Sequence, residues 1–353
     1  MKADPGAARS RPRLPRPRGY LSDAVISWLR TGEGTLPTRE DIQRKHPYGA
    51  DPQLALYVLY ELHYQGFDRV DDEHEWAPEL LVVRRHLEEA FLRTLRADVP
   101  ALGAREAMAG LLTEPAGGDD SSISHYLKRA GRLWQLREYA ALRSLYHLKE
   151  ADPHAWVLPR LRGRAKAGMA AIEFDEFGAG RAEDIHARLF ADLMSDLSLE
   201  TAYGHYVDLA PAETLAIVNL MSLLGLHRSL RGALIGHFAT VEVTSSPGSR
   251  RLAEAMRRTG AGAAAERFYD EHVEADAVHE QIVRREVVEG LLKDEPDLEP
   301  DVAFGIGATG FLEGRLTGYL LAAWREERSA LPAPLPLVAA GHREPKPSGV
   351  GGS

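Results

Sequence analysis

Apolar residues recur at helical spacing along most of the 353-residue chain, and no segment of the sequence alternates apolar and polar residues in the manner of a β-strand. In segment 78–95, for example, Leu80, Val83, Leu87 and Phe91 fall on one helical face. Alanine, leucine and arginine are plentiful, whereas aromatic residues make up only 7% of the chain, a balance that favours helices over sheets. The sequence therefore predicts an all-α protein.

Two tails and one glycine-rich seam divide the chain. Residues 1–19 are rich in Pro and Arg and residues 329–353 in Pro, Gly and Ala, so both are predicted to be disordered tails. The seam Glu114–Asp120 separates an N-terminal helical segment, residues 20–114, from a larger helical body, residues 121–328. The predicted helices span 52–66, 78–95, 122–149, 161–177, 182–194, 230–245, 248–258, 263–292 and 302–328.

Charge and cysteine content narrow the function. The formal net charge of −9 disfavours nucleic-acid binding, because phosphates would be repelled. The chain has no cysteine, which excludes disulfides, thiolate metal sites and thiol nucleophiles, so any metal must be held by His, Asp and Glu. There is no apolar stretch typical of a secretory signal and none long enough to span a bilayer. We therefore expect a cytoplasmic protein with no nucleic-acid and no membrane partner.

One helical segment carries three metal-ligating residue types on a single stripe. His272, Asp276 and His279 stand at positions i, i+4 and i+7, which share one face of a helix. Two imidazoles and a carboxylate in a row suit a divalent transition metal such as iron or zinc. The alternative is a solvated helix face with ordinary ion pairs.

Further donors occur in the preceding helices. Glu176 ends one predicted helix and His186 opens the next, and the glycines of segment 178–180 allow the two to converge. Glu150 follows another helical segment, where the alternative is an exposed residue near a helix end.

Glu242 lies in a mostly apolar helical segment, where a carboxylate is costly to bury unless it is paired or binds a metal. The alternative is a salt bridge to Arg228 or Arg231. Together, four carboxylates and three imidazoles from five helical segments suit two iron ions inside a helical bundle.

These residues lie in stretches that resemble iron-containing redox enzymes of the haem-oxygenase-like di-iron oxidase and oxygenase superfamily. The resemblance runs from about Leu54 to about Trp324. Five stretches carry it: Tyr146–His154, Asp175–Arg181, Gly225–Gly232, Gly236–Ser246 and Glu271–Glu280.

The resemblance implies an all-α, haem-oxygenase-like helical bundle without haem, in which residues 121–328 form a di-iron catalytic domain. It implies two Fe(II) ions per chain that react with dioxygen. One iron would be held by Glu176, His186 and His272, the other by Glu150, Asp276 and His279, with Glu242 as an additional or bridging carboxylate.

The function expected from the resemblance is that of an O2-dependent non-haem di-iron oxidoreductase acting on a small, amino-acid-derived metabolite. Two alternatives stay open: a non-catalytic iron- or small-molecule-binding helical protein, and a cofactor-independent oxidase on the same fold. The expected partners are dioxygen and a small-molecule substrate. An electron donor, a homodimer and the role of residues 20–114, as a cap or in self-association, stay open.

Overall fold

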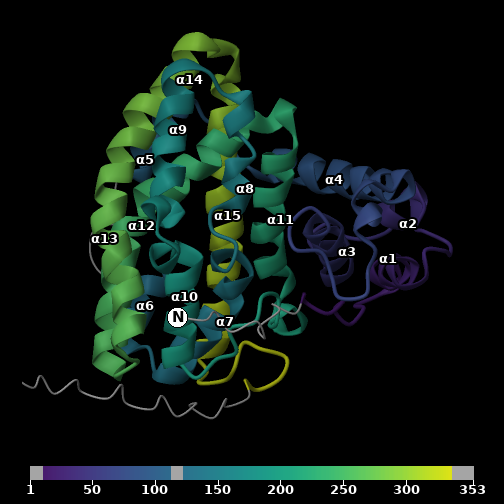
Figure 1. Cartoon of the computed structure of the whole chain (residues 1–353), viewed down its shortest axis with the longest axis horizontal. Helices are drawn as coiled ribbons and strands as arrows, with labels where there is room; N and C mark the ends of the chain where they lie inside the picture. The colour runs from purple at the N-terminus through teal and green to yellow at the C-terminus, as the bar shows by residue number, and fades with distance from the viewer. Residues whose placement is uncertain (1–10, 113–121, 336–353) are drawn as a thin grey trace, which may run out of the picture.

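The computed structural model describes residues 11–112 and 122–335, which form helices joined by turns, without a β-strand in either range (Figure 1). The α-helices are α1 (Tyr20–Thr31), α2 (Arg39–Gln43), α3 (Ala50–Glu61), α4 (Pro78–Asp98), α5 (Ala104–Leu111), α6 (Ile123–Ala130), α7 (Leu133–His147), α8 (Asp152–Ala155), α9 (Gly163–Glu176), α10 (His186–Asp196), α11 (Ala212–Leu226), α12 (Arg231–Thr259), α13 (Ala263–Ile282), α14 (Glu289–Asp294) and α15 (Glu299–Trp324). The all-α prediction is confirmed.

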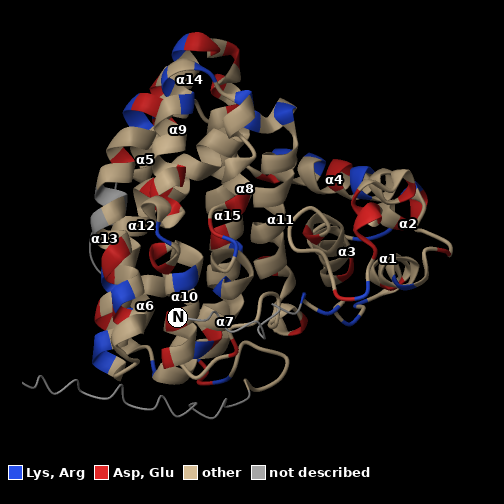
Figure 2. Ribbon diagram, in the orientation of Figure 1, with Lys and Arg blue, Asp and Glu red and all other residues tan. Residues whose placement is uncertain are grey.

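A bundle of long helices forms the body of the molecule (Figure 1). Helix α12 packs against α13 and α15, α10 packs against α13, and α11 packs against α15. The acidic residues at the end of α9 lie part-way along this bundle, as the red segments of Figure 2 show. Within the two described ranges, no helix is both long enough and apolar enough to cross a bilayer.

Helices α12 and α15 approach each other closely at two glycines. A Cβ atom on Gly236 would lie 2.0 Å from the carbonyl oxygen of Val302, and one on Gly305 would lie 1.9 Å from that of Ala233. No side chain fits at those distances, so the two backbones are in direct contact. This contact fixes the spacing of two helices that line the interior of the body.

Helices α1 to α4 form an N-terminal lobe beside α11, with α3 packed between α1 and α11 (Figure 1). A buried ion pair joins the lobe to the body: Glu61 at the end of α3 contacts Nζ of Lys149, and the two residues are 0% and 2% exposed. The Tyr203 hydroxyl donates to Oε2 of Glu61 at 2.6 Å. Nζ of Lys149 also lies 4.0 Å from the centre of the Tyr64 ring, a cation–π contact.

The described parts of the predicted tails are ordered, contrary to the prediction. Arg11 pairs with Asp72 at 2.6 Å, and the backbone and side chain of Arg16 donate to Asp208. Arg11 thus has its carboxylate partner on the N-terminal lobe and Arg16 on the body. Beyond α15, the amide of Ala330 donates to Glu138 at 3.1 Å. Residues 1–10 and 336–353 lie outside the described ranges.

Two predicted divisions of the chain into helices were wrong, and a third predicted helix contains an unexpected turn. The segment predicted as one helix over 122–149 is divided between α6 and α7 at Gly131, whose backbone is extended. Arg258 donates to the carbonyl oxygens of Leu127 and Gly131 at this break. Conversely, α12 continues through Pro247, where two helices were predicted, since it packs along α13 and α15 on either side. The predicted helix 263–292 contains a π-helical turn, Val283–Val288. The seam Glu114–Asp120 lies outside the described residues.

Candidate metal centre

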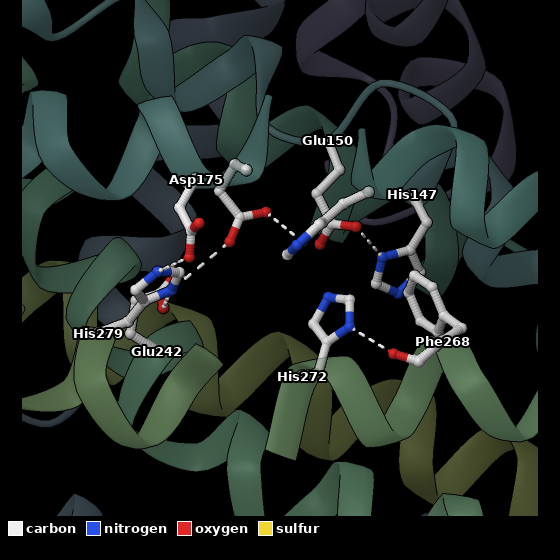
Figure 3. Close-up of polar contacts among 9 residues, drawn as sticks. His147, Glu150, Asp175, Glu242, Phe268, His272 and His279 are labelled. Carbon is white, nitrogen blue, oxygen red and sulfur yellow. Dashed lines mark hydrogen bonds and ion pairs between the residues drawn. The ribbon is translucent and has the colours of Figure 1, made fainter. Parts of the chain in front are cut away.

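Six of the seven predicted ligands face one another inside the bundle (Figure 3). They form two groups, each with its ligand atoms within 4.8 Å of one another and every member buried. Triad 1 consists of Glu150, His186 and His272, and triad 2 of Glu176, Glu242 and His279.

The turn after α9 brings the two triads together. Glu176 is the last residue of α9 and His186 is the first of α10. Between them Gly178 has φ +77°, and a Cβ there would lie 2.7 Å from the amide nitrogen of Ile185, so the turn requires glycine. As a result, Oε2 of Glu176 lies 2.7 Å from Nδ1 of His186. This contact joins triad 2 to triad 1.

In triad 1, His272 directs one ring nitrogen at the site. Its Nδ1 lies 2.7 Å from the carbonyl oxygen of Phe268, which can only accept, so Nδ1 carries the proton. In the neutral ring Nε2 then has the free lone pair, and this buried atom has no hydrogen-bond partner among the described residues. Nearby, Nδ1 of His147 lies 2.9 Å from Oε2 of Glu150 and orients that carboxylate.

In triad 2, His279 is surrounded by carboxylates. Its Nδ1 lies 3.2 Å from Oε2 of Glu242 and 3.6 Å from Oε1 of Glu176, and its Nε2 lies 3.0 Å from Oδ2 of Asp175. Figure 3 shows Asp175 and Glu242 on either side of the His279 ring. The salt bridge from Glu242 to Arg228 or Arg231 that the sequence left open is not observed, since Arg231 pairs with Glu295.

The grouping differs from the division that the resemblance implied. Glu176 lies with His279 rather than with His272, and Glu150 lies with His186 and His272. Helix α13 carries the backbone of Asp276, whose side chain lies outside the described residues. The reason for the exchange is tertiary: the turn at Gly178 places Glu176 between the two triads, which spacing along the chain does not reveal.

Three residues of the site were missed by sequence reasoning. Asp175 contacts His279, and His147 contacts Glu150. Glu173 is 2% exposed and neither of its carboxylate oxygens has a hydrogen-bond partner in the described chain. Burial, with the nearby charges of Glu176 and Glu242, raises the pKa of Glu173 to about 9. Its position one turn before Glu176 was the available signal.

The charge balance of the site suits a cation. Burial opposes ionisation of Glu150, but the neighbouring His147, His272 and His186 hold its pKa below the usual value. Burial, followed by the charges of Glu150 and Glu176, raises the pKa of Tyr146 well above its ordinary value. Buried carboxylates and imidazoles converge here, and Nε2 of His272 has no hydrogen-bond partner among the described residues. Such a set of donors fits iron ions.

A cavity of about 310 Å³ opens beside triad 1. Glu150 and His272 lie in its wall, together with a partly buried ion pair between Arg143 and Glu313. Eight Ser and Thr residues and three tyrosines supply hydroxyl groups to the lining: Ser122, Ser124, Ser245, Ser249, Thr240, Thr244, Thr309, Thr317, Tyr139, Tyr146 and Tyr269. The cavity is large enough for a small molecule next to the ligating atoms.

A family model described as an iron-containing redox enzyme matches residues 137–313, half of the chain. The chain belongs to this family. The matched span contains both triads and runs from α7 to α15, and the family identifies the protein as an iron-containing redox enzyme. The matched span is shorter than the resemblance predicted from the sequence and leaves out the N-terminal lobe. No curated protein matches the chain at a significant level.

Proposed function

We propose that the protein is an O2-dependent non-haem di-iron oxidoreductase that oxidises a small metabolite. The observation that carries the proposal is the pair of buried triads joined by the 2.7 Å contact between Glu176 and His186. Glu150, His186 and His272 would hold one iron, and Glu176, Glu242 and His279 the other. Asp276, from the same stripe as His272 and His279, is proposed as a further ligand. Membership of the iron-containing redox family supports the identity of the metal.

Ferrous iron held by these residues supplies the electrons and open coordination positions that reduction of dioxygen requires. The chain's own contribution is to orient its donors. Phe268 fixes the tautomer of His272, His147 orients Glu150, and Asp175 contacts the second nitrogen of His279. The surrounding apolar helices exclude water from the reaction.

The cavity beside triad 1 is the proposed substrate site. Arg143 and Glu313 lie 2.8 Å apart in its wall, and Nε of Arg143 has no hydrogen-bond partner in the described chain. A zwitterion offers a carboxylate to Arg143 and an ammonium group to Glu313. This arrangement supports an amino-acid-derived substrate, positioned next to the carboxylate of Glu150.

An anaerobic iron titration tests the proposal. The full-length protein is titrated with Fe(II), bound iron is counted after gel filtration, and oxygen consumption is then recorded with an electrode. We expect two irons per chain and rapid oxygen uptake in the wild type. His272→Ala and His279→Ala should each bind about one iron and lose the uptake. His205→Ala, at an exposed histidine outside the site, is the matched control and should behave as wild type.

Three outcomes would contradict the proposal. Unchanged iron stoichiometry in both site variants would show that His272 and His279 are not iron ligands. Iron binding without oxygen uptake would favour a non-catalytic iron-binding protein. Oxygen uptake that is independent of iron would favour a cofactor-independent oxidase.

A further inference from the structure

A second cavity, of about 460 Å³, opens at the α14 end of the bundle, between the start of α9 and the turn that leads into α12. Figure 2 shows basic residues (blue) around the end of α11 and the start of α9. Its charged lining comprises Arg160, Arg162, Arg228, Arg231, Asp294 and Glu295. Four positive and two negative side chains leave a surplus of two positive charges, in a chain whose net charge is −9.

Two of the four arginines are held by structural contacts. Arg160 donates to the carbonyl oxygens of Gly225 and Leu226 at the end of α11, the latter at 2.8 Å. Arg231 pairs with Glu295. These two guanidinium groups are therefore fixed in the cavity wall, and their positions do not depend on a ligand.

The other two arginines have no such contact. The side chains of Arg162 and Arg228 have no hydrogen bond or salt bridge within the described chain, although both lie near enough to Glu295 to lower its pKa. That carboxylate is already paired with Arg231. Burial and the positive charge of Arg228 also lower the pKa of Arg160, so two like charges face each other. Such an arrangement is stabilised by an anion between the guanidinium groups.

We propose that this cavity binds the phosphate group of a small phosphorylated molecule. Guanidinium groups offer paired N–H donors that match phosphate oxygens, and a phosphate dianion would neutralise the surplus of two positive charges. The cavity volume exceeds that of a bare phosphate and leaves room for the rest of a small molecule.

The site is separate from the candidate metal centre. Helix α9 begins at the cavity with Gly163 and ends at Glu176 in triad 2. At 1.5 Å per residue, the two ends of this helix lie roughly 20 Å apart. A molecule of the size of the cavity does not span that distance, so the bound phosphate is not part of the redox substrate at the irons.

Isothermal titration calorimetry on the full-length protein tests the proposal, with inorganic phosphate and glycerol 3-phosphate as probes. Both are titrated into protein with and without iron, since phosphate itself associates with iron. We expect saturable binding of both probes regardless of iron, tighter for the ester. The double variant Arg162→Gln/Arg228→Gln should bind at least tenfold more weakly, because these side chains have no structural partner to disturb.

The control variant Arg39→Gln/Arg85→Gln removes the same charge from exposed positions on the N-terminal lobe. It should keep wild-type affinity. If this control bound the probes as weakly as the Arg162→Gln/Arg228→Gln variant, the loss of affinity would come from long-range charge alone, and the proposal would be overturned. Four other results would also overturn the proposal. Two concern the probes: no saturable binding, or binding that requires iron. The others are equally tight binding of a dicarboxylate such as malonate, and loss of iron binding in the Arg162→Gln/Arg228→Gln variant.

Discussion

The ion pair between Glu61 and Lys149 is expected to carry much of the coupling between the N-terminal lobe and the metal site. Lys149 directly precedes Glu150 of triad 1, while its side chain reaches into the lobe. Removing one partner of a buried ion pair typically costs about 3–5 kcal/mol, because the other charge is left without compensation. We expect Glu61→Gln to reach that range, since the buried ammonium group of Lys149 then loses its carboxylate contact. It keeps ring contacts with Tyr57 and Tyr64 and an electrostatic interaction with Asp152.

The reverse substitution should cost less. In Lys149→Met the carboxylate of Glu61 keeps the hydrogen bond from Tyr203, so the expected loss is about 1–3 kcal/mol. The double variant Glu61→Gln/Lys149→Met buries no net charge and should lie near the wild type, since replacing both partners of a buried pair is often close to neutral. The coupling energy of the cycle is then at least about 4 kcal/mol, the smallest sum of the two single losses.

Urea denaturation of the four proteins, followed by circular dichroism, measures this cycle without the ionic screening that guanidinium salts add. Bound iron after anaerobic loading is the second readout. We expect Glu61→Gln to lose iron from triad 1 and the double variant to recover it, because the turn that carries Glu150 is held again. Additivity of the two single effects to within about 0.5 kcal/mol would refute the reasoning.

Two further predictions concern packing and pH. Gly305→Ala should lower the free energy of unfolding by about 1–3 kcal/mol, since its Cβ would meet the carbonyl oxygen of Ala233. On the same helix, a Cβ at Gly310 would have nothing within 4 Å. Gly310→Ala should therefore raise the free energy of unfolding by about 0.5–1 kcal/mol in the same urea assay. Burial lowers the pKa of His154 to about 4 and that of its partner His237 below its ordinary value. The unfolded chain therefore binds more protons between pH 6.5 and 4, so stability of the iron-free protein should fall through this window as pH falls, by roughly 3 kcal/mol for His154. A flat urea midpoint across that range, or the same slope in His154→Gln, would contradict this assignment.

The helical class and two parts of the candidate site were predictable because they depend on local spacing. His272 and His279 stand on one stripe of α13, and a glycine turn links Glu176 to His186, so the sequence itself constrains where these side chains point. Glu242 was identifiable from its apolar surroundings, where a lone carboxylate needs a partner.

The rest depends on contacts that spacing does not encode. Glu173, Asp175 and Glu176 lie within four consecutive residues, and only the approach of α13 selects which of them meets His279. The continuation of α12 through Pro247 likewise depends on its neighbours, because the local signal of proline is a helix end.

The glycine contacts between α12 and α15 constrain how the substrate range of this protein can be changed. One turn after each glycine, a threonine hydroxyl donates a hydrogen bond to the glycine carbonyl oxygen: Thr240 to Gly236 at 3.0 Å and Thr309 to Gly305 at 2.7 Å. Both threonines lie in the wall of the cavity beside triad 1. Because backbone contact prevents these two helices from moving closer, an engineered change of cavity volume must come from side chains such as these threonines. Enlarging or reducing them should alter which molecules fit without displacing the proposed iron ligands.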